Sequence, residues 1–230
     1  MKLPPRQLLQ GRLTPQAQDA NAVNFKGDEE STSSRLRVYR KTYIAMLASS
    51  TLSLIASLVL SYDAIKIAAQ PTVKLACDIN AIVSCGKVAR SWQSNLLGFP
   101  NAFLGLMSEP VVIALAIAGL GLVVFPRWFL RVAHIFYALG LAFAFWLLSQ
   151  SFFVIKALCP WCLLVTLSTV TVFSTISRIN IMENTWGLSA ERYKRLVDIL
   201  DRGWGRVFYT FTYSFLALAI FLKYGTKLIA

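Results

Sequence analysis

The chain has 230 residues, of which 56% are hydrophobic, with a mean hydropathy of +0.57 and a formal net charge of +12. A soluble domain of this length rarely has so apolar a composition, so an ordinary soluble enzyme is excluded and an integral membrane protein is predicted. The positive charge would favour a nucleic-acid ligand in a soluble protein, but in a membrane protein it follows from the distribution of basic residues among the loops.

Residues 1–41 are polar and have no hydrophobic periodicity, which predicts a disordered tail. The tail ends in the basic cluster "RLRVYRK", immediately before the first apolar run. That run is too long for the apolar region of a secretory signal, so we expect an uncleaved anchor rather than a removed leader.

Five apolar segments follow the tail, and each is predicted to be a membrane helix. They span residues 42–64, 102–125, 129–153, 158–179 and 207–222. The predicted fold class is therefore an all-α integral membrane protein. A four-helix transmembrane bundle would occupy residues 42–179, with a long outer loop over 65–101, and a fifth transmembrane helix with a short outer tail would occupy 207–230.

The connection over residues 180–206 has a pattern of its own. Tyr193, Leu196, Leu200 and Trp204 recur at steps of three and four residues, and charged residues fill the gaps. This spacing predicts an amphipathic helix lying on the cytoplasmic membrane surface, or alternatively a helical hairpin between two spans.

Basic residues orient the predicted spans. They concentrate in the amino-terminal tail, in the short connection near Arg127 and Arg131, and in the connection over 178–206. The positive-inside rule assigns these regions to the cytoplasm, which places the amino terminus inside and the carboxyl terminus outside a bacterial inner (plasma) membrane. All four cysteines then fall on the outer face, where the oxidising environment permits disulfide chemistry.

The stretch "CPWC" places Cys159 and Cys162 at the predicted start of the fourth span. Pro160 favours the first position of a helix, so Cys159 is expected at the N-cap and Cys162 one turn inside, facing the bundle. A helix N-terminus stabilises a thiolate, which is the form that attacks disulfides. The motif therefore predicts a redox couple at the boundary between water and lipid, where lipid-soluble quinones are available.

A second pair, Cys77 and Cys85, lies in "CDINAIVSC" in the first outer loop. Two pairs on one membrane face favour a relay by thiol–disulfide exchange. Two static structural disulfides remain an alternative, and so does a four-thiolate zinc site. No histidine or carboxylate cluster supports zinc, so no metal site is predicted, and Leu163 stands where haem attachment would require a histidine.

The sequence resembles the vitamin K epoxide reductase family, in its bacterial disulfide-forming branch. Four pieces carry the resemblance in order across residues 42–177: "CDINAIVSC", "GKVARSW", "GFPNAFLG" and "CPWC". The other familiar quinone-linked membrane oxidase, the DsbB type, has its CxxC in the first outer loop and the wider pair in the second. The reversed order here favours the first family.

The resemblance implies a four-helix bundle around a quinone pocket. Cys159 and Cys162 match the active-site pair, and Cys77 and Cys85 match the loop shuttle pair. Ser91 matches a hydroxyl residue that supports this loop. The expected quinone site comprises Asn101, which matches a polar residue near the quinone carbonyl, together with Cys162, Ser91, Trp161 and Glu109.

Two of these residues have alternative interpretations. Glu109, in "SEP", is the only acid well inside a predicted span. Intramembrane carboxylates are costly and usually functional, which favours a proton source for the quinone, although pairing with a hydroxyl or partial exposure near Pro110 would also explain it. Trp161 is explained by interfacial anchoring, or by a role in shaping the quinone site.

The function implied is a quinone-dependent membrane thiol oxidase that reoxidises a thioredoxin-like, DsbA-type partner and so supports disulfide formation in exported proteins. Either menaquinone or ubiquinone suits the chemistry. The chain ends eight residues after Leu222, so the partner is expected to be a separate protein rather than a fused domain. Alternatives are a quinone or vitamin K epoxide reductase, which Thr166 disfavours because animal enzymes carry a tyrosine there, and a non-enzymatic membrane protein with static disulfides.

Overall fold

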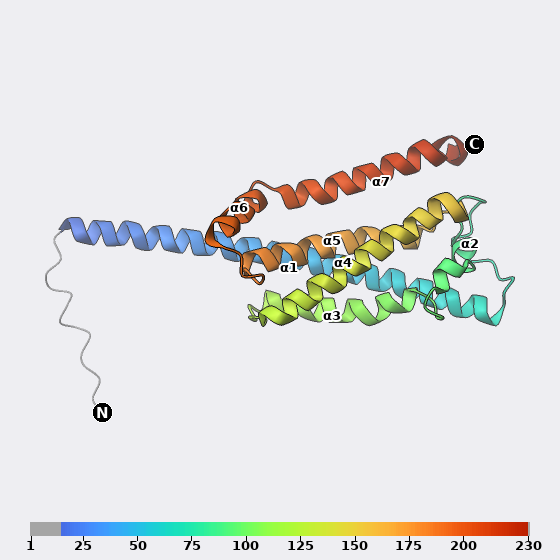
Figure 1. Cartoon of the computed structure of the whole chain (residues 1–230), viewed down its shortest axis with the longest axis horizontal. Helices are drawn as coiled ribbons and strands as arrows, with labels where there is room; N and C mark the ends of the chain where they lie inside the picture. Colours follow the sequence, from blue (N-terminus) through green and yellow to red (C-terminus); the bar gives the residue numbers. More distant parts are fainter. Residues whose placement is uncertain (1–14, 230) are drawn as a thin grey trace, which may run out of the picture. The chain divides into compact units, whose positions relative to one another are not determined.

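The structure, a computed structural model, describes the backbone of residues 15–229 and the side chains of residues 38–200, 202–203 and 207–223. Over that part of the chain the fold is helical and contains no strand, which confirms the all-α prediction. Figure 1 shows the elements, whose bounds are α1 Pro15–Ala69, α2 Cys85–Ala89, η1 Trp92–Asn95, α3 Ala102–Leu120, α4 Arg127–Gln150, η2 Ser151–Ile155, α5 Pro160–Met182, α6 Ala190–Asp201 and α7 Trp204–Ile229.

Among the residues that the structure describes, four helices are long and apolar enough to cross a membrane, in agreement with the predicted four-helix bundle. They are Val38–Ala69, Ala102–Leu120, Arg127–Ile155 and Pro160–Met182. The fifth predicted segment is a shorter apolar helix, Val207–Lys223, within α7. The chain is therefore a multi-pass membrane protein by the length and composition of its helices.

The amino-terminal region differs from the predicted disordered tail. The chain divides into two units, 1–41 and 42–230, and helix α1 begins in the first of them at Pro15. Residues 1–14 of the predicted tail lie outside the described part of the chain. A proline suits the first helical turn, and extending an existing helix costs less than nucleating one, so residues 15–41 are helical although their composition is polar.

Small residues allow the first and second spans to approach closely. Ser50, Ser53 and Ser57 of α1 are at most 1% exposed. Gly105 of α3 faces this row, because a Cβ atom placed there would lie 2.1 Å from the Ser57 Oγ. A larger residue at Gly105 would separate the helices, as expected where membrane helices associate through small side chains.

The predicted amphipathic connection contains helix α6, and polar contacts join the connection to α4 and to the end of α5. Tyr193 donates a hydrogen bond to the Met182 carbonyl at 3.2 Å, and Arg131 of α4 donates to the Thr185 carbonyl. The location of α6 on a membrane surface stays a prediction.

The third span ends in an irregular turn that leads into the CxxC motif. Helix α4 continues as one π-helical turn, η2, and Lys156 then adopts a left-handed conformation with φ of 54°. A π-turn changes the helical register, and a left-handed residue ends the helix. Three residues later the chain reaches Cys159 and the start of α5.

Candidate functional site

Cys159 caps helix α5, as the sequence predicted. Its Sγ accepts a hydrogen bond from the backbone N–H of Cys162 at 3.3 Å, and Pro160 occupies the first helical turn. The Cys162 thiol also donates to Cys159, and this bond, helped by the backbone N–H groups of Cys162 and Trp161, lowers the pKa of Cys159 despite its burial. Cys159 is thus the member of the CxxC pair prepared to be a thiolate.

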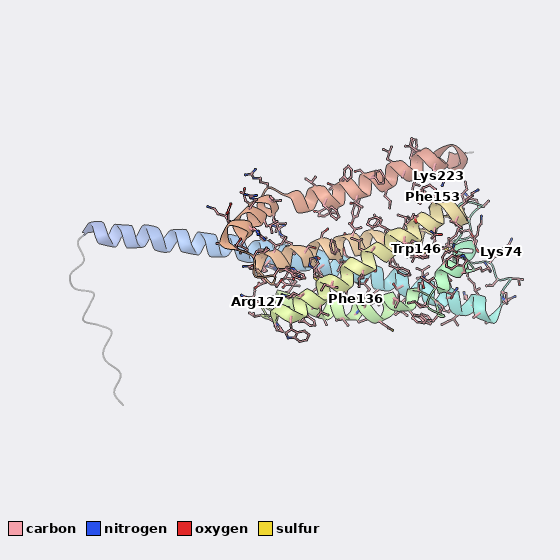
Figure 2. All side chains as sticks on the ribbon, in the orientation of Figure 1. Lys74, Arg127, Phe136, Trp146, Phe153 and Lys223 are labelled. Atoms are coloured by element: carbon pink, nitrogen blue, oxygen red, sulfur yellow. A yellow bond between two sulfur atoms is a disulfide. The ribbon has the colours of Figure 1, made fainter. Side chains whose placement is uncertain are left out.

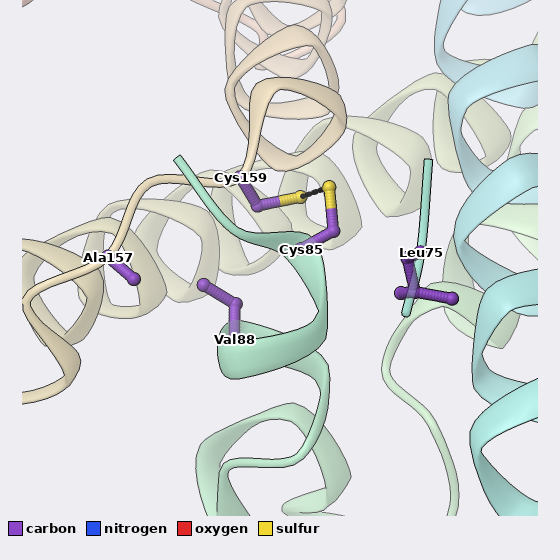
Figure 3. Close-up of a cluster of buried hydrophobic side chains, with 5 residues drawn as sticks. All are labelled: Leu75, Cys85, Val88, Ala157 and Cys159. Carbon is purple, nitrogen blue, oxygen red and sulfur yellow. Dashed lines mark hydrogen bonds between the residues drawn. The ribbon is translucent and has the colours of Figure 1, made fainter. Parts of the chain in front are cut away.

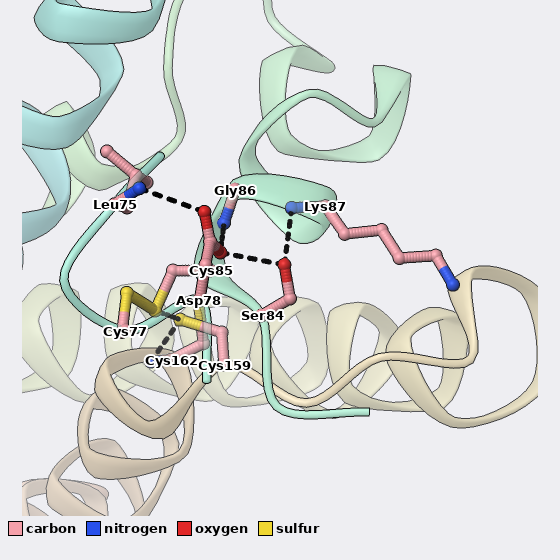
Figure 4. The surroundings of a disulfide bond; sticks show 9 residues. All are labelled: Leu75, Cys77, Asp78, Ser84, Cys85, Gly86, Lys87, Cys159 and Cys162. Carbon is pink, nitrogen blue, oxygen red and sulfur yellow. Dashed lines mark hydrogen bonds between the residues drawn. A yellow bond between two sulfur atoms is a disulfide. The ribbon is translucent and has the colours of Figure 1, made fainter. Parts of the chain in front are cut away.

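The loop pair is closed and lies directly against the CxxC motif. Cys77 and Cys85 form a disulfide with a sulfur–sulfur distance of 2.06 Å, while Cys159 and Cys162 are free thiols. The Cys159 Sγ lies 3.5 Å from the Cys85 Sγ (Figures 3 and 4). Cys85 and Cys159 are 1% and 2% exposed, so bulk solvent does not reach this contact.

Asp78 organises the loop around its disulfide (Figure 4). Its carboxylate accepts hydrogen bonds from the backbone N–H of Leu75 at 2.9 Å, the Ser84 hydroxyl at 2.7 Å and the backbone N–H of Gly86 at 2.8 Å. Burial would raise the pKa of Asp78, but these three hydrogen bonds and nearby Arg90 together hold it below its ordinary value. The charged form of Asp78 therefore stabilises the folded loop.

Gly86 is required by this arrangement. A Cβ atom at Gly86 would lie 2.4 Å from a guanidinium nitrogen of Arg90 and 2.6 Å from the Asp78 carboxylate. Arg90 itself donates to the carbonyls of Pro71 and Val73, at 2.9 Å and 2.6 Å. The residue after Cys85 must therefore be small for the loop to close over its own anchor.

A short backbone pairing holds the loop to the CxxC segment. Val83 and Leu158 form an isolated parallel β-bridge. In it the Ser84 N–H donates to the Leu158 carbonyl at 3.1 Å, and the Leu158 N–H donates to the Ile82 carbonyl at 2.6 Å. Because Ser84 precedes Cys85 and Leu158 precedes Cys159, this pairing sets the register of the two sulfur atoms.

A cavity of about 530 Å³ opens inside the bundle beside these sulfurs. Its size and mostly apolar lining are those of a small-molecule site. Several predicted site residues share its lining: Cys85, Cys159, Cys162, Asn101 and Glu109. Ser91 and Trp161 are not among the described residues that line it, and Cys77 lies on the loop outside it.

Asn101 is held by the loop so that part of its amide stays available. Its Nδ2 donates to the Gln93 carbonyl at 2.7 Å, and its backbone N–H donates to the Ser94 carbonyl at 2.8 Å. The Oδ1 atom is buried and has no hydrogen-bond partner among the described residues. The second Nδ2 hydrogen is therefore the donor that fits a quinone carbonyl oxygen, whereas Oδ1 is an acceptor and fits only a hydroxyl, such as that of a quinol.

Ser91 and Trp161 support the surroundings of the sulfurs. The Ser91 hydroxyl donates to the Val88 carbonyl at 2.6 Å and lies 3.3 Å from the Ser94 hydroxyl. Trp161 packs against the buried cluster that contains Cys85 and Cys159. Their assignment to the quinone site itself stays a prediction.

Glu109 pairs with two hydroxyl groups in the interior. It is 3% exposed and accepts from the Ser53 hydroxyl at 2.8 Å and from the Tyr137 hydroxyl at 3.3 Å. Sequence reasoning named Glu109 but missed these partners. The steps of three and four residues among serines in the first span could have indicated Ser53, whereas nothing in the sequence distinguishes Tyr137 from other aromatic residues.

Comparison with known families decides what this arrangement is. The model of the vitamin K epoxide reductase family matches residues 44–177, which is more than half of the chain. The chain belongs to the vitamin K epoxide reductase family. No curated protein matches the sequence.

Family membership determines the general activity. This family member is a membrane oxidoreductase that acts on thiols and disulfides and exchanges electrons with a quinone. Members of the family work with thioredoxin-like proteins. Such chemistry requires cysteines that can exchange disulfides and a space for a quinone beside them. The two cysteine pairs in contact and the adjoining cavity provide both.

Proposed function

We propose that this protein is a quinone-dependent thiol oxidase that reoxidises a separate thioredoxin-like protein of the DsbA type, and so supports disulfide formation in exported proteins. The observation that carries the proposal is the distance of 3.5 Å between the sulfurs of Cys85 and Cys159, one in a disulfide and the other in a thiol. Exchange requires a sulfur to approach a disulfide sulfur, and the loop already holds the two together.

The first steps move electrons from the partner into the loop pair. Cys77 is half-buried, whereas Cys85 is 1% exposed, so the partner thiolate attacks Cys77 and releases Cys85 as a thiolate. Cys85 then attacks Cys159 of an oxidised CxxC pair, which forms a Cys85–Cys159 disulfide and releases Cys162. The second partner thiol frees Cys77, and the partner leaves oxidised.

The next steps complete the transfer to the CxxC pair. Cys77 attacks Cys85, which restores the loop disulfide and releases Cys159. The result is a closed loop pair beside two free thiols, which is the redox state of this structure. The buried contact between the Cys85 and Cys159 sulfurs supports exchange over the alternative of two static disulfides, which would need no contact between the pairs.

The last steps take place at the cavity. As Cys159 and Cys162 close their disulfide, they lose two electrons and two protons, and Cys162 lies on the cavity wall where these leave. A bound menaquinone or ubiquinone supplies the electron acceptor. Asn101 would orient its headgroup, and Glu109, held by the Ser53 and Tyr137 hydroxyls, would hold a proton at the same cavity.

The proposed arrangement in the membrane follows from the distribution of Lys and Arg. The amino terminus would lie in the cytoplasm and both cysteine pairs on the outer face of the plasma membrane, where a DsbA-type partner works.

A reconstituted assay tests the function. Purified protein is mixed with a reduced DsbA-type protein and either a menaquinone or a ubiquinone analogue, and quinone absorbance is followed. We expect quinone reduction that depends on the partner and that Cys162→Ser abolishes. Partner oxidation without quinone reduction, or equal rates in the Cys162→Ser variant, would refute the proposal.

A further inference from the structure

Helix α7 lies outside the residues matched by the family model, yet it contacts the segment that leads into the CxxC motif. It is attached to α5 through Tyr213, whose hydroxyl donates to the Leu167 carbonyl at 3.0 Å and also pairs with the Thr171 hydroxyl. Its outer end then meets the π-helical turn η2 that closes the third span.

Lys223 makes the polar part of this contact. Its Nζ donates a hydrogen bond to the Phe152 carbonyl and lies over two rings, 5.5 Å from the centroid of Phe152 and 4.6 Å from that of Phe153. Figure 2 shows Lys223 beside Phe153 at this end of the molecule. A cation is favourable at the carboxyl end of a helix, and aromatic faces stabilise it further.

Apolar packing extends the contact to the relay itself. Phe152 and Leu158 form a buried cluster, and Ala219 and Ile220 of α7 pack against it together with Ile82 of the loop. Leu158 and Ile82 are the residues that hydrogen-bond each other in the β-bridge beside Cys85 and Cys159. Helix α7 therefore packs against the cluster that contains Leu158, one partner of the pairing that sets the sulfur–sulfur contact.

We propose that α7 is a positioning element for the thiol relay: Lys223 and Ile220 fix the η2–Leu158 segment, and so hold Cys159 against Cys85. This inference rests on the relay of the proposed function, because positioning by α7 matters only if the sulfurs of Cys85 and Cys159 exchange. Lys223 and Ile220 are positioning residues and touch no reacting sulfur.

The test measures how well the fold holds the two sulfurs, without any quinone. In a Cys77→Ser/Cys162→Ser background only Cys85 and Cys159 remain. Oxidised glutathione converts their two thiols into one disulfide and is itself reduced to two molecules of glutathione. The fraction of protein with the Cys85–Cys159 disulfide is measured by mass spectrometry after acid quenching, at several ratios of oxidised to reduced glutathione. The equilibrium constant for forming this disulfide increases when the fold holds the two sulfurs closer together.

Lys223→Met keeps the side-chain length but removes the charge and the donor. We expect it to lower this equilibrium constant by about three- to tenfold, as loss of one charged hydrogen bond predicts. Lys223→Arg keeps the charge and the donor, so its equilibrium constant should stay near that of the parent protein. Lys74→Met, which removes an exposed loop lysine, is the matched control and should leave the constant unchanged.

A second pair of variants tests the role of α7 independently, in case Lys223→Met does not fold. Ile220→Ala should lower the constant about threefold or more through lost packing, whereas Leu222→Ala, at a site 75% exposed, should not. Unchanged constants in Lys223→Met and Ile220→Ala would overturn the role of α7. If the parent pair itself fails to cross-link at any glutathione ratio, the relay of the proposed function fails instead.

Discussion

At the scale of single residues, the four sulfurs have different exposures, and the proposed function gives them different roles. Cys77 is half-buried on the loop, Cys85 and Cys159 are buried against each other, and Cys162 lies on the cavity wall. We expect Cys159→Ser and Cys162→Ser to abolish quinone reduction, because neither variant can close the CxxC disulfide. Cys77→Ser and Cys85→Ser should abolish oxidation of the protein partner, which stopped-flow assays with reduced partner would measure.

The same roles predict which intermediate accumulates. In Cys77→Ser the remaining Cys85 can attack the oxidised Cys159–Cys162 disulfide and release Cys162, but the thiol that would carry the exchange forward by attacking Cys85 is gone. We expect a Cys85–Cys159 disulfide in peptide mass maps recorded without reductant. A cross-link between Cys85 and Cys162 instead would contradict the proposed order of the relay.

Asn101 is the residue that separates the quinone step from the thiol steps. Asn101 lines the cavity, and its amide keeps one hydrogen that no described residue is seen to accept. Asn101→Ala should slow quinone reduction by about 10²-fold, the usual cost of losing one well-placed donor. Single-turnover oxidation of the partner should be unchanged, and a quinone rate equal to that of the parent protein would contradict this placement of the headgroup.

At the scale of elements, the loop between the first and second spans depends on a charged carboxylate. Asp78 accepts three hydrogen bonds, and its pKa is lowered in the folded protein. Its stabilising effect is therefore complete above the ordinary pKa of an aspartate and is lost as the pH falls through the lowered folded value. Asp78→Asn should cost about 1 kcal/mol near neutral pH, discounted for exposure.

Thermal unfolding of the two proteins across a pH series measures this effect. The difference between wild type and Asp78→Asn should shrink on acidification, because protonation removes the same charge from the wild type. Asp198→Asn is a matched control, since its ion pair with Arg202 is 59% exposed on the Asp198 side and contributes little. A constant difference at all pH values would show that hydrogen-bond geometry, not charge, holds the loop.

The elements also show how far sequence reasoning extends. Four spans and the cap at Cys159 follow from length, hydropathy and the Pro160 signal, which are local properties. The β-bridge between Val83 and Leu158 joins residues 75 positions apart within two apolar stretches, and no local pattern marks it. The partners of Glu109 come from two other helices, so they depend on helix packing that a single sequence does not encode in its periodicity.

At the scale of the whole molecule, one cavity and one buried sulfur contact lie at the same end of the bundle. The cavity is lined by α1, α3, α4 and α5, and the loop between the first and second spans contributes Val88 and Gln93 to its lining. A quinone there would be reached from lipid, while Cys77 would be reached from water. In the proposed function, this division would let a single protein accept electrons from a soluble thiol and release them to a membrane carrier.

The division requires that the loop face the compartment of the partner, and topology is the last prediction. Lys and Arg gather in the amino-terminal tail and between α5 and α7, which predicts an inside amino terminus and an outside carboxyl terminus. Cysteines introduced singly at Ser31 and Thr226, in a background without the four native cysteines, should react with a membrane-impermeant maleimide from opposite sides of intact cells. We expect labelling at Thr226 before lysis and at Ser31 only after it. Labelling of both positions from the same side would mean that Val207–Lys223 does not cross the membrane, because an even number of spans would then return the chain to its starting side.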